Sequence, residues 1–363
     1  MHATRDVAGP TTSSIASRRR YRGSVTAIDW LGGPRPVQPV TAVAATVPDG
    51  VPVLRDGVQT IMRRVFGARR PSPPGDHDPG LCGAGSPSWT IIAEPAAIAG
   101  GVRALLLQTL HPLAMAGVAS HSRYREDPLA RLQSTSSWVT TSTFGTTAEV
   151  LAAAQAVRRA HRVVRGTTPG GRPYRAGDPA LLAWVSMALT SSFLAADRLW
   201  SPTPVDRAAA DRFVAEQSRL AALLDERVPL APLLRDPDAG DLLRAGEVDL
   251  PLYDELPGTV AQLTTALDAV VPQLAVGPQA RDAVRFLRWP PLAPALRAAY
   301  LPLFAGAAGS LPRIHRRMLH LSAGRLTGRA AVANAGNLLG VLRSAVGRSP
   351  AYTLATARVT ATA

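Results

Sequence analysis

The stretch TTAEVLAAAQAVRRAHRVVRG, residues 146–166, is the clearest helix in the chain. Thr146 and Glu149 have the spacing of a capping box, in which a hydroxyl and a carboxylate each accept a hydrogen bond from a backbone N–H at the helix start. Gly166 is the expected C-terminal stop. Between these ends, residues spaced i, i+4, i+7, i+11 and i+14 share one face: Val150, Ala154, Val157, His161 and Val164. The pattern predicts a helix that turns an imidazole toward the protein interior.

The buried position of His161 has two readings. Neutral imidazole is a common metal ligand, and small alanines around the ring would leave room for a metal. A histidine on an apolar helix face is more often a core residue or a hydrogen-bond partner between helices. The helix pattern alone leaves both readings open.

The composition of the 363 residues favours helix throughout. Hydrophobic residues make up 46% of the chain and aromatic residues only 5%. Alanine and leucine dominate, and both have high helix propensity. Few runs alternate with the period of a strand. We therefore expect an all-α fold, a single globular helical domain.

The charge of the chain is strongly positive, at +14, and all 40 basic residues are arginine. Such a charge suits nucleic acid, an anionic lipid surface, or an arginine bias of the coding genome that carries no function. The arginines are scattered along predicted helices rather than gathered in one stripe, so no nucleic-acid partner is expected.

The single cysteine, Cys82, excludes a disulfide framework and a cysteine-rich zinc site. The longest apolar stretch, 104–119, is shorter than the 18 residues of a membrane span. Arg18, Arg19 and Arg20 resemble an export signal, but no apolar segment follows them. We expect a cytoplasmic protein without a signal peptide.

Three parts of the chain are expected. Residues 1–75 read as an arginine- and proline-rich leader, partly disordered, in which 51–70 has the pattern of a basic amphipathic helix that would permit peripheral membrane contact. Residues 76–325 read as the helical domain, and 326–363 as a C-terminal helix and tail.

Within the domain, helices are predicted from periodicity, from Asp-Pro starts and from proline breaks. One helix carries a kink at Pro112, and residues 166–177 read as a loop. The region 228–256 reads as a loop with one short helix. One predicted helix begins at Pro128 and contains Arg131, Thr135 and Trp138; the others are 95–120, 146–166, 178–199, 203–227, 257–272, 278–287, 293–308, 312–322 and 323–348.

Several catalytic signatures are missing from the sequence. It has no glycine-rich nucleotide loop, no His-Glu-x-x-His, no Gly-x-Ser-x-Gly, no Cys-x-x-Cys and no Glu-x-x-His pair of the di-iron bundles. What remains is histidine, arginine and hydroxyl residues on apolar helices. This set suits a haem pocket, which needs one axial imidazole and polar groups around a flat ring.

Five segments, in order, resemble one family. They are Asp78-Pro-Gly80 with Ser88-Trp89, then LLLQTLHPLAMAGVASHSRYREDPLARLQST (105–135), GRPYRAGDP (171–179) with Leu182-Ala-Trp184, Trp289-Pro-Pro, and Leu311-Pro-Arg313. Together they resemble the superfamily of ER-bound oxygenases of the mpaB type and latex-clearing proteins (rubber oxygenases). The resemblance covers roughly residues 76–320.

The resemblance implies an all-helical domain, with globin-like packing around haem b, that uses dioxygen on an apolar, prenyl-like or unsaturated substrate. Its proximal iron ligand falls on His161, the residue that the helix pattern also selects. Its Arg-x-x-x-Thr pair falls on Arg131 and Thr135, expected to bind the cofactor and to act in catalysis. His111 and His121 are expected beside the cofactor.

The sequence departs from latex-clearing proteins at two places. Their lysine inside the Arg-x-x-x-Thr motif is Ser134 here, and a histidine that many relatives carry is Ser186. Rubber is therefore not the expected substrate. Two alternatives stay open: a haem-binding sensor or carrier without turnover, and a haem-free helical protein that binds lipid or nucleic acid.

Overall fold

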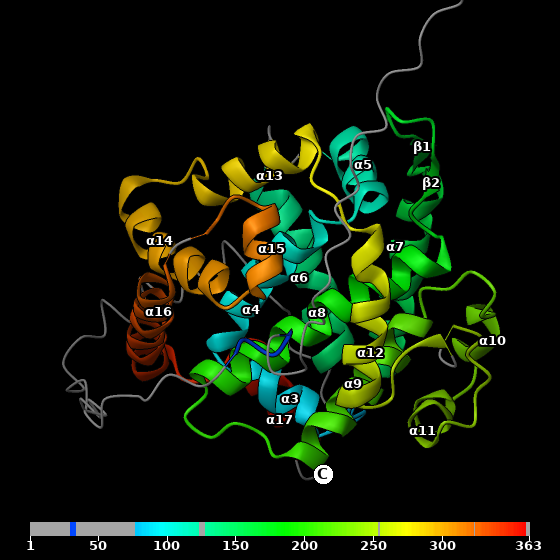
Figure 1. Cartoon of the computed structure of the whole chain (residues 1–363). Helices are drawn as coiled ribbons and strands as arrows, with labels where there is room; N and C mark the ends of the chain where they lie inside the picture. The colour runs from blue at the N-terminus through cyan, green and yellow to red at the C-terminus, as the bar shows by residue number, and fades with distance from the viewer. Residues whose placement is uncertain (1–29, 34–76, 123–127, 253–254, 323, 361–363) are drawn as a thin grey trace, which may run out of the picture.

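Helices form almost all of the regular secondary structure in the described residues, as the computed structural model in Figure 1 shows. The structure describes residues 30–33, 77–122, 128–252, 255–322 and 324–360. Within these ranges, the strands β1 (Arg165–Thr167) and β2 (Pro173–Arg175) form one antiparallel pair. The prediction of an all-α fold is therefore confirmed.

The helices follow one another with short connections. In chain order they are α3 (Pro87–Ala93), α4 (Ala96–Gln108), α5 (Pro112–His121), α6 (Pro128–Phe144), α7 (Thr147–Val163), α8 (Pro179–Trp200), α9 (Arg207–Ala222), α10 (Leu230–Leu233), α11 (Ala239–Ala245), α12 (Val260–Val270), the 3₁₀ turn η2 (Val271–Gln273), α13 (Pro278–Arg288), α14 (Pro294–Gly309), α15 (Arg313–Met318), α16 (Arg325–Val346) and α17 (Pro350–Thr360).

Helix α8 is the centre of the fold, and it packs along α4. Gly100 of α4 permits this close approach, because a Cβ there would lie 2.9 Å from Phe193 Cδ1 and 3.2 Å from Ala196 Cβ. Helices α9 and α12 also contact α8, and α14 joins α4 to α16. In Figure 1, α14 and α16 lie on one side of α8, and α7, α10 and α11 on the other.

By length and composition, α8 is also the one described helix that could cross a membrane; α3 and α4 pass the same test together, although a 91° bend separates them. The apolar window of α8 is 67% buried by the rest of the protein. Asp178 caps its N-terminus, and Pro179 occupies the first turn, as the sequence predicts. Helix α8 is therefore a core helix of this domain.

The single kinked helix predicted for 95–120 is wrong, because α4 and α5 are separate helices. Pro112 lacks an N–H and restricts the residue before it to extended backbone. His111 accordingly adopts φ −91° and ψ 113°, and its side chain caps the new helix. Pro112 thus begins α5 instead of bending α4.

Gly166 does not end α7, which stops at Val163. Gly166 lies in β1 opposite Tyr174, where a Cβ would stand 2.7 Å from the Tyr174 Oη. The predicted loop 166–177 is therefore a small hairpin, and the glycine is required by the close approach of a tyrosine ring.

Two further differences concern short helices. The region 228–256 holds two helices, α10 and α11, rather than one. Within the expected C-terminal tail, Pro350–Thr360 form α17, where the buried Arg358 donates hydrogen bonds to the carbonyls of Asp78 and Phe144. These bonds attach α17 to the N-terminal side of the domain.

Trp30 is the one leader residue that the structure describes as buried, with no exposed surface. Its indole Nε1 donates to Asp268 Oδ1 of α12 at 2.6 Å, and its carbonyl accepts from Arg103 Nη2 of α4 at 2.5 Å. The leader therefore contributes a side chain to the core. The basic helix predicted for 51–70 lies outside the described residues.

Candidate functional site

Helix α7 carries His161 near its C-terminal end. The predicted capping box is present, since Thr146 Oγ1 accepts from Glu149 N at 3.2 Å and Glu149 Oε2 accepts from Thr146 N at 2.9 Å. Val150 and Ala154 are fully buried, and His161 is half-buried with its Nδ1 shielded from solvent. The imidazole therefore lies at the edge of the buried face rather than in its centre.

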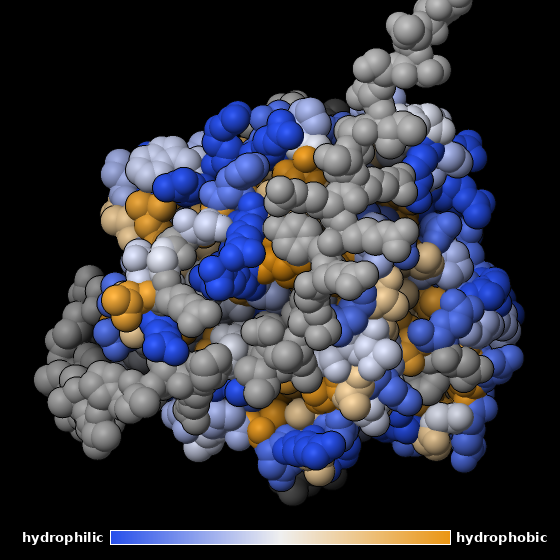
Figure 2. Space-filling model, viewed as in Figure 1, coloured by the Kyte–Doolittle hydropathy of each residue, from blue (hydrophilic) through white to orange (hydrophobic). Residues whose placement is uncertain are grey.

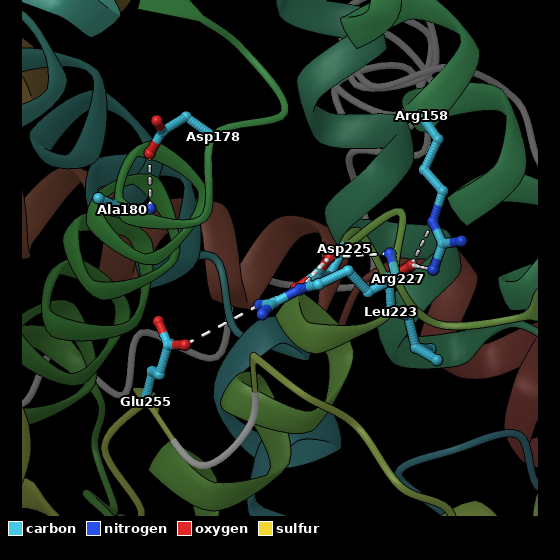
Figure 3. A network of polar contacts seen from close by, with 7 residues as sticks. All are labelled: Arg158, Asp178, Ala180, Leu223, Asp225, Arg227 and Glu255. Atoms are coloured by element: carbon cyan, nitrogen blue, oxygen red, sulfur yellow. Dashed lines mark hydrogen bonds and ion pairs between the residues drawn. The ribbon is translucent and has the colours of Figure 1, made fainter.

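The most deeply buried face of α7 includes Arg158, one turn before His161. Its Nε donates to the carbonyl of Leu223 at 2.8 Å (Figure 3). Its Nη1 donates to the carbonyl of Val228 at 2.7 Å. These bonds join α7 to the end of α9. A buried arginine that binds backbone carbonyls was not predicted, because nothing in a single sequence indicates which carbonyls a distant loop leaves free.

The loop that accepts from Arg158 is itself fixed by ion pairs. Arg227 makes a two-pronged contact with Asp225 and lies 3.9 Å from Glu255 (Figure 3). Burial of Asp225 opposes ionisation, but the hydrogen bonds from Arg227 outweigh it and lower the pKa of Asp225 below its usual value. The ionised carboxylate therefore holds the loop against which α7, and with it His161, is positioned.

The Arg-x-x-x-Thr pair lies on α6, which packs against α7. Arg131 and Thr135 share one helix face because they are four residues apart. At a rise of 1.5 Å per residue, Arg131 and His161 each lie about 20 Å along their own helix from the short α6–α7 connection. Thr135 is half-buried; the side chain of Arg131 is outside the described part. The two positions therefore lie at similar distances from the connection between the two helices.

His111 lies at the start of α5. The residue is 5% exposed, its Nδ1 accepts from Ala114 N at 3.5 Å, and its ring lies 5.7 Å from that of Trp184. Burial lowers the pKa of His111, and the Arg172 guanidinium lowers it further. A neutral His111 that caps α5 has a sufficient structural role.

His121, at the other end of α5, is exposed. Its Nε2 lies 3.2 Å from the carbonyl oxygen of Arg165, and its ring meets Tyr174 edge-on at 6.2 Å. Close by, a Cβ on Gly117 would lie 3.4 Å from Val164 Cγ1. These contacts place α5 against the hairpin that follows His161, so α5 forms one wall beside the end of α7.

Arg103 and His315 form a buried basic pair that the sequence analysis did not single out. Both side chains have no exposed surface, and the His315 ring lies 4.7 Å from that of Trp30. Burial and the nearby Arg103 cation lower the pKa of His315 to about 3, and burial lowers that of Arg103 to about 9. The sequence offered one signal for this pair: Arg103 is the one charged residue in a long apolar run, which indicates a buried arginine.

The donor set around His161 limits which iron centre could form. Within the described ranges, no three His, Cys, Asp or Glu residues gather as ligands for a bare metal ion. A haem needs only one protein donor, because the porphyrin supplies four nitrogens. One half-buried imidazole therefore fits haem better than it fits an iron held by several side chains.

A surface cavity of about 260 Å³ lies elsewhere, around α10. None of its lining residues belongs to the predicted site, and it contains no imidazole and no hydroxyl, so we do not assign the chemistry to it. Its lining comprises Arg227, Pro229, Pro232, Leu233, Val248, Asp249 and Pro251.

Comparison with known proteins supports the resemblance seen in the sequence. Residues 89–344 match the family described as ER-bound oxygenase mpaB/B′/rubber oxygenase, catalytic domain. No curated protein and no solved structure matches the chain. The matched segment runs from α3 to α16 and includes every predicted site residue. The chain therefore belongs to the family of mpaB-type and rubber-oxygenase catalytic domains.

Proposed function

We propose that this protein is a haem b-dependent oxygenase that uses dioxygen on an apolar, prenyl-like or otherwise unsaturated small molecule. Membership of a family of oxygenase catalytic domains supports the oxygenase part. The observation that carries the haem part is His161: a half-buried imidazole near the end of a well-capped helix, with no gathering of further metal ligands in the described ranges.

In this proposal His161 is the single protein ligand of the haem. When bound, haem supplies a site at which dioxygen is activated. The chain provides the rest: α7 is held in position by its capping box and by Arg158, so the helix that carries His161 is fixed before any cofactor binds. Preorganised ligands of this kind keep their geometry because neighbouring hydrogen bonds restrict them.

Arg131 and Thr135 are proposed to bind and orient polar groups at the site. Arginine suits a carboxylate of the cofactor, since its planar fork can donate two parallel hydrogen bonds. Thr135, one turn later, offers a hydroxyl on the same face. Ser134 stands where latex-clearing proteins have lysine, so no amine from this position competes for the cofactor.

The proposed substrate class follows from what surrounds the site. The core beside α7 and α8 is built from leucine, valine, alanine and aromatic residues, so a substrate bound there would meet apolar side chains. Ser134 and Ser186 replace residues of the latex-clearing type, which argues for a small prenyl-like molecule rather than polyisoprene. We propose a cytoplasmic location at a membrane surface, and the ER-bound members named in the family description support the membrane part of this proposal.

The test is oxygen uptake by haem-loaded protein with a panel of alkenes and prenyl compounds, followed by mass spectrometry of the products formed under ¹⁸O₂. We expect uptake that depends on the substrate, with label in the product. Arg131→Ala should reduce turnover far more than Arg159→Ala, a change to an exposed arginine of α7. Haem binding without uptake on any substrate would instead indicate a carrier or sensor. A protein that binds no haem would overturn the proposal.

A further inference from the structure

The positive charge of the chain is concentrated at its C-terminal end. Residues 269–363 contain 12 arginines and one carboxylate, whereas residues 77–268 contain 17 arginines and 20 carboxylates. Arginines that are spread along the sequence can still meet on one face of the folded domain. The distribution of charge on the surface is therefore a property that the fold decides.

Helix α13 directs its arginines outward in a stripe. Arg281, Arg285 and Arg288 are spaced i, i+4 and i+7, and all three are exposed. The opposite face is apolar: Ala280 and Ala283 are buried with Met115 of α5. One acidic side chain, Asp282, pairs with Arg285 at 3.0 Å. Helix α13 thus packs its apolar side against the protein and exposes its cationic side to solvent.

Helix α15 adds to the same face. Arg313 and Arg317, four residues apart, are exposed, while His315 between them points into the core. Figure 2 shows hydrophilic side chains that run from α13 at the top of the view down over α15. We call this surface, formed by Arg281, Arg285, Arg288, Arg313 and Arg317, the basic face.

A large apolar side chain stands at the end of the stripe. Trp289 follows Arg288 directly and is 58% exposed, and the guanidinium of Arg297 lies 5.2 Å from the centre of its ring. The loop after Trp289 continues with Pro290, Pro291 and Leu292. Exposed tryptophan among cations is typical of side chains that settle at the headgroup level of a bilayer.

We propose that the basic face and Trp289 dock this protein onto an anionic lipid bilayer. Arginines attract the negative surface, and the ring of Trp289 enters the interface. A lipid surface fits better than nucleic acid, because the chain after Trp289 continues with proline and leucine, which offer no side-chain hydrogen bonds to base edges. The proposal does not depend on haem or on turnover.

The test is sedimentation of the full chain with vesicles of phosphatidylglycerol and phosphatidylcholine, compared with phosphatidylcholine alone. Each arginine near an anionic surface contributes roughly fivefold to partitioning. The variant Arg281→Gln/Arg285→Gln/Arg288→Gln should therefore bind about a hundredfold more weakly. Binding should also weaken with added salt, because surface charges are screened.

A matched control removes the same charge elsewhere. Arg207, Arg212 and Arg235 are exposed residues of α9 and the loop after α10, and their triple change to Gln should leave vesicle binding near the wild-type value. Circular dichroism checks that both variants fold. Trp289→Ala should lower binding without changing its salt dependence.

Three results would overturn the proposal. They are equal binding of the two triple variants, equal binding of wild type to neutral and anionic vesicles, and binding to an oligonucleotide in place of vesicles. The leader is present in every variant, so any contribution from its arginines cancels in the comparison.

Discussion

Buried His315 makes the stability of this domain depend on pH. Its pKa is lowered to about 3 in the folded protein by burial and by Arg103, while an unfolded chain has the ordinary value of 6.5. Above pH 6.5 the residue is neutral in both states and contributes nothing to the pH dependence. As the pH falls below 6.5, His315 binds a proton in the unfolded state but not in the folded state, so the free energy of unfolding decreases.

The size of this loss follows from the difference between the two pKa values. Each pH unit between 6.5 and 3 costs about 1.4 kcal/mol, so acidification from pH 7 to pH 5 removes about 2 kcal/mol through His315 alone. Other groups titrate in the same range, and a variant that lacks the imidazole is needed to separate them. His315→Phe keeps a ring beside Trp30 and cannot be protonated.

The assay is urea unfolding of wild type and variants at pH 7, 6 and 5. Between pH 7 and pH 5, His315→Phe should lose about 2 kcal/mol less than wild type. His320→Asn changes an exposed histidine five residues later and should follow the wild-type curve. If His315→Phe and wild type lose the same free energy, then His315 is not a buried neutral imidazole and the reasoning fails.

Two further pairs of variants test the packing of α4 and the anchoring of α7. Gly101→Ala should stabilise the protein by up to ~1 kcal/mol, because a Cβ there meets nothing within 4 Å. Gly100→Ala should destabilise it by about 1–3 kcal/mol, because the added Cβ would press against α8. Urea unfolding compares the two variants. Arg158→Met should cost at least about 2 kcal/mol, since two buried carbonyls lose their donor, and exposed Arg159→Met should stay within ~0.5 kcal/mol. Equal effects within either pair would contradict the packing described.

Local signals in the sequence predicted most helices, because caps and prolines act on neighbouring residues. The capping box of Thr146 and Glu149 and the Asp178-Pro179 start are both confirmed. His111 shows the limit of such signals: the sequence indicates that Pro112 disturbs a helix, but tertiary packing decides between a kink and a break. Gly166 shows the same limit, since its partner Tyr174 comes from another strand.

The site was predictable only in part, for a related reason. The helix pattern identified His161, and the family resemblance identified Arg131 and Thr135; the roles of all three residues remain predictions. Arg158 could not be assigned from sequence, because its partners lie 65 and 70 residues away. His315 and Trp30 are in contact although most of the chain separates them in sequence, and no local sequence pattern predicts a contact between residues so far apart.

Two of the expected site residues have gained structural explanations. His111 caps α5, and His121 contacts the hairpin carbonyl of Arg165. Neither contact requires a cofactor, and His161 is the residue that is proposed to bind the iron. A direct test of that one bond is therefore worth more than any measurement on the remaining histidines.

The most direct measurement is the visible spectrum of the haem-loaded protein as wild type, His161→Ala and His77→Ala, in which the last replaces an exposed histidine. We predict that wild type and His77→Ala share one Soret band and haem affinity. His161→Ala should lose or shift the band, and added imidazole should restore it by filling the place of the missing ring. An unchanged spectrum and affinity in His161→Ala would contradict the assignment of His161 as the iron ligand.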